Sequence, residues 1–555
     1  MLQSQTVKNR LKTKILSNLS MKKKHLLLLS FLSGLIFVIG WPVNGFPAFL
    51  FTAFVPLLFI EDYILKNKRE FSKFSVFFYT YPAFLIWNVA TTWWIWNSTP
   101  AAIAAWTLNA MLMGVVINVY HLSRRNLSRG REGYFFLVFY WIGFEYMHLN
   151  WDLTWTWLNI GNGFAVFYKW VQWYEFTGAL GGTFWVLLIN ILIFKSLQSY
   201  LAKDMKKFGY QLTFSLLVLF IPIIYSFISY STYEETVNPV AVVVCQPNID
   251  PYTEQYAFSA TEVVKMNLDL ATPFLDDNVR FLLSPESTLY DNLWEGRLHQ
   301  SAAVRKLQNF TKANQNINIV VGASTHKKFN ENEDLPASVR FHKGGGFYYD
   351  SYNTTLVINK TPEIQVHHKS KLVPGVEAMP SWGILKFVEK FAIDLGGTTG
   401  TLGKDKNPSP FVVDDTLKIA PLVCYESIFG EYCGKFVTKG AQAFFLITND
   451  GWWGDTPGYK QHLSFSSLRA LEMRRSIARS ANTGISCFIN QRGDIQQPTE
   501  YWEPAAIRQE INMNDEVTFY ARYGDYIGRV SAFISIVFVL ISFVFAIRGK
   551  KGELY

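Results

Sequence analysis

The chain has 555 residues, which exceeds what one hydrophobic core accommodates and predicts two or three domains. Half of the residues are hydrophobic and the mean hydropathy is positive, a composition typical of membrane proteins. The four cysteines are too few for a disulfide framework, and no Cys/His cluster has the spacing of a metal site. The net charge of +9 would suit a nucleic-acid binder, but its distribution along the chain argues otherwise.

Eight apolar segments predict a polytopic α-helical membrane domain, because a bilayer core about 30 Å thick needs about 20 apolar residues. They are 25–40, 46–60, 75–96, 101–121, 133–148, 174–197, 212–230 and 527–547. The first follows three lysines and has no convincing small-residue cleavage site. We therefore interpret it as a spanning helix rather than a signal peptide.

Basic residues predict the orientation of these helices. With the N-terminus inside, every inside segment carries several Lys or Arg, whereas the short outside loops contain only Lys169. This pattern predicts a cytoplasmic N-terminus (1–24), a membrane domain (25–235), an extracytoplasmic domain (236–525), an eighth helix (526–547) and a cytoplasmic tail (548–555). It also accounts for much of the positive charge, so we expect no nucleic-acid partner.

Tryptophans and two carboxylates gather near the outer ends of the predicted helices. The tryptophans are Trp93, Trp94, Trp96, Trp151, Trp155, Trp157, Trp170 and Trp173. They suit an interfacial aromatic belt or, alternatively, a surface for lipid entry below an enzyme domain. Glu145 and Glu175 lie in or beside apolar segments, where a carboxylate is either functional or a hydrogen-bonded packing residue.

The polar segment 236–525 alternates short β-rich runs with helical stretches, which predicts an α/β domain. The predicted strands are 240–245, 279–283, 317–321, 354–358, 417–423, 444–448 and 485–489. The predicted helices are 259–274, 302–314, 426–435 and 461–480.

Cys424 lies between a predicted strand and a predicted helix, on a turn like the nucleophile elbow of other hydrolases. The helix N-terminus would favour a thiolate there, and backbone N–H groups could hold an oxyanion. Taken alone, Cys424 suits a buried core position better, because cysteine is among the most commonly buried residue types.

Two residues at other strand ends favour the catalytic interpretation. Glu286 lies just past the predicted strand 279–283, and Lys369 follows an extended stretch. A carboxylate can take the thiol proton, and an ammonium can stabilise the thiolate and a tetrahedral oxyanion. Singly, Glu286 would be a helix cap and Lys369 a solvated surface charge, so the prediction depends on their combination with Cys424.

This combination resembles the Glu-Lys-Cys triad of the nitrilase, or carbon–nitrogen hydrolase, superfamily. With the membrane helices, it resembles the bacterial apolipoprotein N-acyltransferase family over nearly the whole chain. The motifs that carry the resemblance are 285–287, 369–377, 423–426, 448–455, 461–462, 469–472 and 479–486, with 157–161 in the membrane part. The chain departs from the family at Gly375-Val376, at Tyr256, where a tryptophan is expected, and at the glycine-rich insert 343–347.

The resemblance implies a nitrilase-like α-β-β-α sandwich that transfers a fatty acyl chain through a Cys424 thioester. The donor would be a membrane phospholipid and the acceptor the N-terminal amine of diacylglyceryl-cysteine in an apolipoprotein, in the last step of lipoprotein maturation. Glu286 would be the general base and Lys369 an oxyanion donor. The implied pocket residues are Glu377, Tyr425, Glu426, Tyr256 and Trp452, with loops 379–384 and 452–459 closing over the site.

The family also implies a multi-pass protein of the bacterial cytoplasmic (inner) membrane, with the catalytic domain facing the periplasm. We expect no metal or organic cofactor, and we expect a monomer. Two other functions stay open at this point. A membrane-anchored amidase acting on a soluble amide needs the same triad but no lipid entrance, and a catalytically silent binding module needs no triad.

Overall fold

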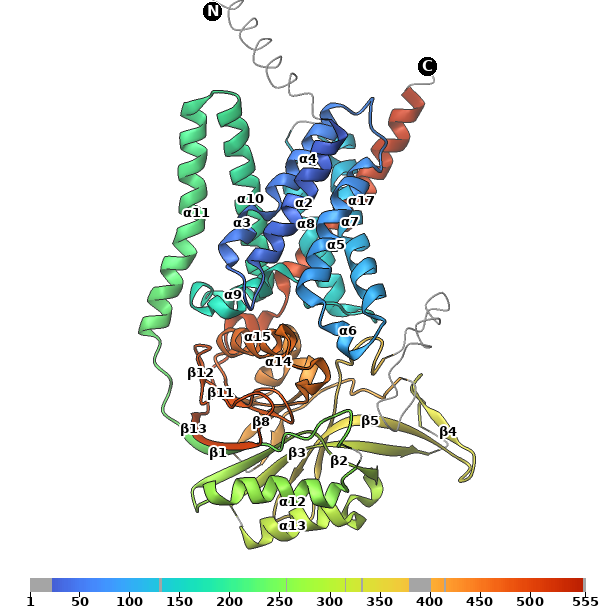
Figure 1. The fold of residues 1–555 in the computed structure, drawn as a ribbon, viewed down its shortest axis with the longest axis vertical. Helices are drawn as coiled ribbons and strands as arrows, with labels where there is room; N and C mark the ends of the chain where they lie inside the picture. The colour runs from blue at the N-terminus through green and yellow to red at the C-terminus, as the bar shows by residue number, and fades with distance from the viewer. Residues whose placement is uncertain are drawn as a thin grey trace, which may run out of the picture.

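Long helices form a bundle that lies on one side of two stacked β-sheets (Figure 1). The computed structural model describes residues 22–128, 132–255, 257–314, 316–330, 333–378, 401–413 and 416–552. The start of α2, the α10–α11 connection and the end of α17 lie at the end of the bundle remote from the sheets (Figure 1). The lysines at 22–24 and 203–207 therefore lie far from the sheets, as the charge pattern predicts.

Within the described residues, six helices are long and apolar enough to cross a membrane. They are α2 (Lys23–Gly40), the run Pro47–Lys66 that contains η1 (Pro47–Phe49), α3 (Leu50–Ala53) and α4 (Val55–Lys66), α7 (Ala102–Asn126), α10 (Ala179–Leu201), α11 (Met205–Thr232) and α17 (Tyr526–Gly552). The other two predicted segments form α5 (Ser75–Thr92) and α8 (Phe135–Asn150), which pack within the bundle. The count of eight spans stays a prediction.

Shorter elements join the bundle to the sheets: α6 (Ile95–Ser98), η2 (Ile160–Trp170) and α9 (Tyr174–Thr177). Both carboxylates that the sequence left open have protein partners in this region. Glu145 accepts hydrogen bonds from Trp141 Nε1, the backbone N–H of Ile160 and Thr183 Oγ1 at 2.6–3.1 Å. Glu175 forms an ion pair with Arg474 at 2.7 Å. These contacts favour the packing interpretation for both carboxylates.

The two sheets have similar sizes and a parallel core of three strands each. The first has the order β13-β1-β2-β3-β5-β4, with β6 paired to β5, and the second has the order β12-β11-β10-β9-β8-β7. The strands of the first are β1 (Pro239–Gln246), β2 (Val279–Trp294), β3 (Asn318–Phe329), β4 (Arg340–His342), β5 (Phe347–Ile358), β6 (Gln365–His368) and β13 (Ala505–Asn512). Those of the second are β7 (Phe411–Val412), β8 (Lys418–Val423), β9 (Ala443–Thr448), β10 (Ser476–Ala481), β11 (Cys487–Ile489) and β12 (Ile495–Gln496).

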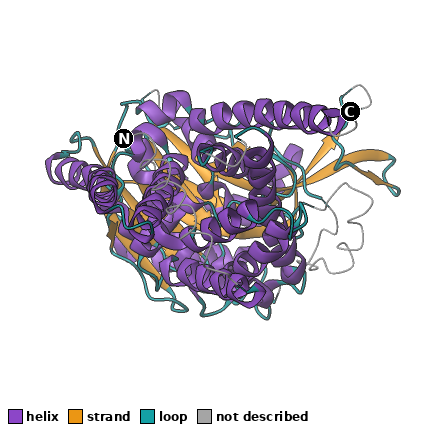
Figure 2. Cartoon of the chain, turned by 90° about the horizontal axis from the view of Figure 1, so that it is seen from above, coloured by secondary structure: helices purple, strands orange, loops and turns teal. Residues whose placement is uncertain are grey.

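The alternation of side chains along β1 explains the layers. Val242 and Val244 pack against the second sheet, whereas Val243 and Cys245 pack against α12 (Ala260–Ala271) and α13 (Ala302–Ala313). The far face of the second sheet packs against α14 (Gly430–Thr438) and α15 (Pro457–Met473), which separate it from the bundle (Figure 1). Seen from above, helices lie in front of the strands (Figure 2). The predicted α-β-β-α sandwich is therefore confirmed.

The helix predicted over 461–480 is wrong beyond residue 473. α15 ends at Met473, Arg474 adopts a left-handed backbone with φ of 47°, and β10 follows. β10 pairs with β9 and β11 and is buried on both faces. Such a strand has no period-two alternation, so its sequence cannot be distinguished from a buried helix.

Candidate active site

Cys424 lies directly after β8, on the turn that the sequence predicts. It is the first residue of a 3₁₀ turn, η6 (Cys424–Ile428), and its φ of 49° lies in the left-handed region. That conformation costs a non-glycine residue about 1–2 kcal/mol, so surrounding contacts must maintain it. The predicted helix over 426–435 is wrong in its start, because α14 begins only at Gly430. Cys424 therefore has no α-helix N-terminus behind it.

The environment of Cys424 favours the thiol over the thiolate at rest. Burial raises the pKa of the Cys424 thiol and the charge of Glu286 raises it further, while Lys369 lowers it. The expectation of a thiolate stabilised by a helix N-terminus is thus corrected. A nucleophile with a raised pKa needs a base that removes its proton during the reaction.

Glu286, Lys369 and Glu377 form a buried cluster with Asn353 on β5. Lys369 Nζ lies 2.9 Å from Glu377 Oε1 and 3.4 Å from Glu286 Oε1. Asn353 Nδ2 donates hydrogen bonds to the same two oxygens, at 2.7 Å to Glu286 and 2.9 Å to Glu377. The backbone N–H of Asn449 donates to Glu286 Oε2 at 3.0 Å. One ammonium therefore balances two carboxylates in a site that excludes most water.

This cluster determines the charge states of its members. Burial opposes the charge of Lys369, but Glu377 and Glu286 outweigh it and raise the pKa of Lys369 above its ordinary value. Burial raises the pKa of Glu286, and Lys369 opposes that rise. The two carboxylates therefore favour the charged form of Lys369, and the raised pKa of Glu286 makes it a stronger base than an exposed glutamate.

The path of β2 brings Glu286 to this position. The pairing of β2 with β3 is interrupted between Ser284 and Leu289, so Glu286 leaves the regular ladder. Gly322 on β3 allows the close approach, since a Cβ there would lie 2.6 Å from the Cα of Glu286. The predicted strand end at 283 thus corresponds to an irregularity within a longer strand.

Glu426 is buried beneath the site and connects its two halves. Its Oε1 accepts hydrogen bonds from the backbone N–H of Ser370 and from Tyr432 OH, both at 2.6 Å. Its Oε2 accepts one from the backbone N–H of Val423 at 2.9 Å. Because Ser370 follows Lys369 and Val423 precedes Cys424, Glu426 fixes the distance between the ammonium and the thiol. It is absent from the cavity lining described next.

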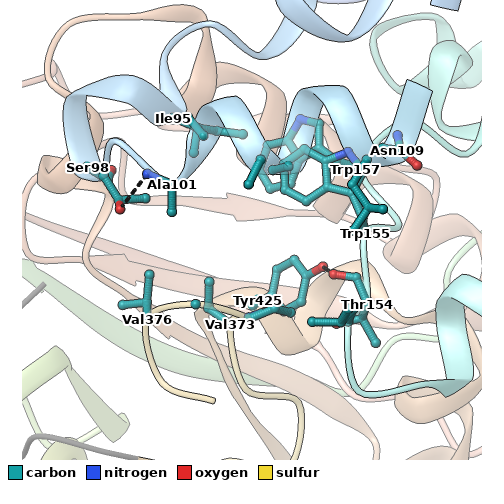
Figure 3. Close-up of a pocket in the computed structure, with 18 of the residues that line it drawn as sticks. Ile95, Ser98, Ala101, Asn109, Thr154, Trp155, Trp157, Val373, Val376 and Tyr425 are labelled. Carbon is teal, nitrogen blue, oxygen red and sulfur yellow. Dashed lines mark hydrogen bonds between the residues drawn. The ribbon is translucent and has the colours of Figure 1, made fainter. Parts of the chain in front are cut away.

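An apolar cavity of about 200 Å³ reaches Cys424 from the helix bundle (Figure 3). One wall comes from α6 and the start of α7, and includes Ile95, Ser98 and Ala101. The opposite wall contains Val373, Val376 and Tyr425, and Thr154 and the tryptophans 155 and 157 close one end. The cavity therefore lies at the junction of the bundle and the sheets.

Four tryptophans of the predicted aromatic belt, Trp94, Trp151, Trp155 and Trp157, line the cavity at this junction. Trp94 contacts Trp453 with ring centroids 4.8 Å apart, and Trp157 Nε1 donates a hydrogen bond to Gln461 Oε1 at 2.7 Å. Both line the cavity, whereas Trp93 and Trp96 are exposed. The lining tryptophans thus border the cavity, and Trp93 and Trp96 face outward. Lipid entry and an interfacial belt both stay predictions.

Of the other predicted pocket residues, some line the cavity and others do not. Tyr425 lines the cavity, and its OH donates to the Thr154 carbonyl at 3.1 Å. Trp452 is not part of the lining, and its neighbour Trp453 is. Tyr256 and the loop 379–384 lie outside the described residues. Asn353, Trp453 and His462 are site residues that the sequence analysis did not single out, although Trp453 and His462 lie in the quoted motifs 448–455 and 461–462.

His368, next to Lys369, makes the stability of this region sensitive to pH. Its Nε2 lies 2.6 Å from Glu295 and its Nδ1 lies 3.1 Å from Asp405. Burial opposes the charge of His368, but these two carboxylates outweigh it and raise its pKa to about 9. The stabilisation is therefore complete below about pH 6.5, the unfolded pKa, and disappears as pH rises toward 9.

We expect the melting temperature of the protein to fall between pH 6.5 and 9 by more than that of His368→Gln. Thermal unfolding of both proteins is measured across this pH range. The other titrating groups are shared by the two proteins, so the difference between their changes in melting temperature reports His368 alone. Parallel curves for the two proteins would contradict the assignment.

The chain is similar to two known protein families and to several relatives. Residues 33–192 match the family described as Apolipoprotein N-acyltransferase N-terminal domain, and residues 240–518 match Carbon-nitrogen hydrolase. An Apolipoprotein N-acyltransferase of Chlorobaculum tepidum is 25% identical over 533 residues, covering 93% of this chain and 96% of the relative. That of Geobacter metallireducens is 26% identical, covering 90% and 91%. A solved amidase from Nesterenkonia sp. has 14% identity and a TM-score of 0.35, and covers 54% of this chain and 99% of its own.

Proposed function

Because the chain belongs to the apolipoprotein N-acyltransferase family of carbon–nitrogen hydrolases, we propose that it moves a fatty acyl chain from a membrane phospholipid to an apolipoprotein. The acceptor is the N-terminal amine of the diacylglyceryl-cysteine. The observation that carries the proposal is the apolar cavity that leads from the helix bundle to Cys424, beside the buried Glu286–Lys369 pair. A soluble amide would not need such an entrance, and the family relatives do not favour the amidase alternative.

In the first half-reaction, Glu286 takes the thiol proton and Cys424 Sγ attacks the ester carbonyl carbon of the phospholipid. The ammonium of Lys369 and the backbone N–H of Tyr425 hold the oxyanion of the tetrahedral intermediate. The carbon–oxygen bond of the ester then breaks, and Glu286 returns the proton to the leaving alkoxide. Lysophospholipid departs and the acyl chain remains on Cys424 as a thioester.

In the second half-reaction, the amine of the lipoprotein attacks the thioester carbon. Glu286 takes a proton from the attacking nitrogen, the carbon–sulfur bond breaks, and the proton passes to Cys424 Sγ. Water competes with the amine, so the apolar lining of the cavity protects the thioester. Glu377 supports Lys369 throughout, since its carboxylate lies 2.9 Å from the ammonium. The reaction is ping-pong and uses neither metal nor organic cofactor.

A thioester-trapping experiment tests the proposal. The purified protein is mixed with phospholipid labelled in its acyl chain, and the label on the Cys424 peptide is measured with and without hydroxylamine, which cleaves thioesters. A diacylglyceryl-cysteine peptide should then remove the label and become N-acylated. Hydrolysis of amides without any label on Cys424 would support the amidase, and neither activity would support a silent binding module.

We further propose that the protein acts as a monomer in the inner membrane, with the sheets on the periplasmic side. The basic segments at the opposite end of the bundle support this orientation. A reporter that is active only outside the cytoplasm is expected to be active when fused after Thr236 and silent when fused after Arg129. The reverse pattern would overturn both the topology and the lipoprotein acceptor, and would leave a cytoplasmic amidase.

A further inference from the structure

A buried histidine on α15 contacts the backbone of Cys424 from behind. His462 Nε2 lies 3.1 Å from the carbonyl oxygen of Cys424, and Nδ1 lies 3.0 Å from Asp450 Oδ1. The ring also borders the cavity and lies beside Trp157 and Trp453, with centroids 6.1 and 5.7 Å away. His462 therefore connects the nucleophile turn to a second set of buried groups.

The second set consists of Asp450 and the two residues that donate hydrogen bonds to it. Arg479 on β10 donates to Asp450 Oδ2 at 2.6 Å, and Thr448 Oγ1 donates to Asp450 Oδ1 at 2.8 Å. Burial opposes the charge of Asp450, but Arg479 outweighs it and keeps the pKa of this carboxyl below its usual range. The anion fixes the orientation of the imidazole in the way that a carboxylate orients other functional histidines.

The turn at Cys424 needs such a support. Its left-handed backbone is unfavourable for cysteine and persists only if the surrounding structure holds it. The Cys424 carbonyl is also the acceptor for Ser427 Oγ at 2.8 Å, but Ser427 belongs to the same turn and can move with it. His462, on the separate helix α15, contacts the Cys424 carbonyl from outside the turn.

We propose that His462 is a positioning residue for the reaction, which holds the carbonyl of Cys424 so that the thiol stays directed toward Glu286 and the cavity. The proposal rests on the proposed function, since it takes Cys424 as the nucleophile. If His462 acted only by filling space, any side chain of similar volume would replace it. If it acts through Nε2, only a side chain with an N–H group at the position of Nε2 will replace it.

Three substitutions distinguish these possibilities. Glutamine can place its amide nitrogen near the Nε2 position, asparagine only near Nδ1, and leucine fills the volume without a donor. We expect His462→Gln to form acyl-enzyme within about threefold of the wild-type rate. Losing a buried hydrogen bond costs about 1–3 kcal/mol, so His462→Asn and His462→Leu should form acyl-enzyme more slowly by at least about fivefold.

Leu468→Ala on the same helix is the matched control, because Leu468 is fully buried in the core and its side chain has no hydrogen-bonding group. It should lower the melting temperature and leave the acylation rate of the folded protein unchanged. Equal rates for the glutamine and asparagine variants would overturn the inference, as would a loss in Leu468→Ala as large as in His462→Leu. If Cys424→Ala itself accumulated acyl-enzyme, the proposed function would fail first and this inference with it.

Discussion

Replacing Cys424 with alanine is expected to abolish acyl-enzyme formation completely. No other thiol can take over, because Cys433 is fully buried in α14 and does not line the cavity. The measurement is the labelled phospholipid assay, with the adduct located by mass spectrometry. Residual label elsewhere in the protein would show that the nucleophile has been assigned wrongly.

Cys245→Ser and Cys487→Ser are the matched controls for this loss. Both cysteines lie in buried strands as small apolar side chains, and burial raises the pKa of each thiol. These substitutions should lower stability at most and keep the acylation rate of the folded protein. A loss of acylation in either control would mean that the assay reports folding rather than chemistry.

Glu286→Gln and Lys369→Met are each expected to reduce turnover by at least about a hundredfold. Removing a general base typically costs about 10²–10⁴ in rate, and removing one oxyanion donor costs about 2.7–4 kcal/mol. Lys369→Met also leaves Glu286 and Glu377 together without their shared cation, which destabilises the fold. Turnover must therefore be measured per folded molecule.

Lys371→Met is the control for the lysine substitution. Lys371 Nζ donates to the carbonyl of Leu149 at 3.3 Å and lies 4.6 Å from the centre of the Phe429 ring, so it contacts the end of α8 rather than the carboxylates. Lys371→Met should therefore reduce turnover only slightly. Equal losses for the two lysines would refute the assignment of Lys369 as the oxyanion donor.

Several features of this protein follow from the sequence alone because they depend on local pattern. Long apolar runs predict the helices of the bundle, since a helix is the way a chain satisfies its backbone groups in lipid. The strand that ends at Val423 predicts the turn at Cys424, and the motif spacing identifies Glu286, Lys369 and Cys424 as candidates. The alternation of strands and helices predicts only an α/β domain, whereas the two-sheet sandwich was implied by the family resemblance.

Other features were decided only by tertiary structure. β10 is a strand because β9 and β11 flank it, although its own sequence is equally compatible with the end of a helix. The state of the Cys424 thiol depends on burial and on Glu286, which lies far away in sequence and outweighs any local effect of the turn. Asn353 and Trp453 join the site through sheet register and through the packing of the bundle against η7 (Asp450–Trp453). Such long-range contacts leave no periodicity in the sequence, because each depends on where a distant segment is placed.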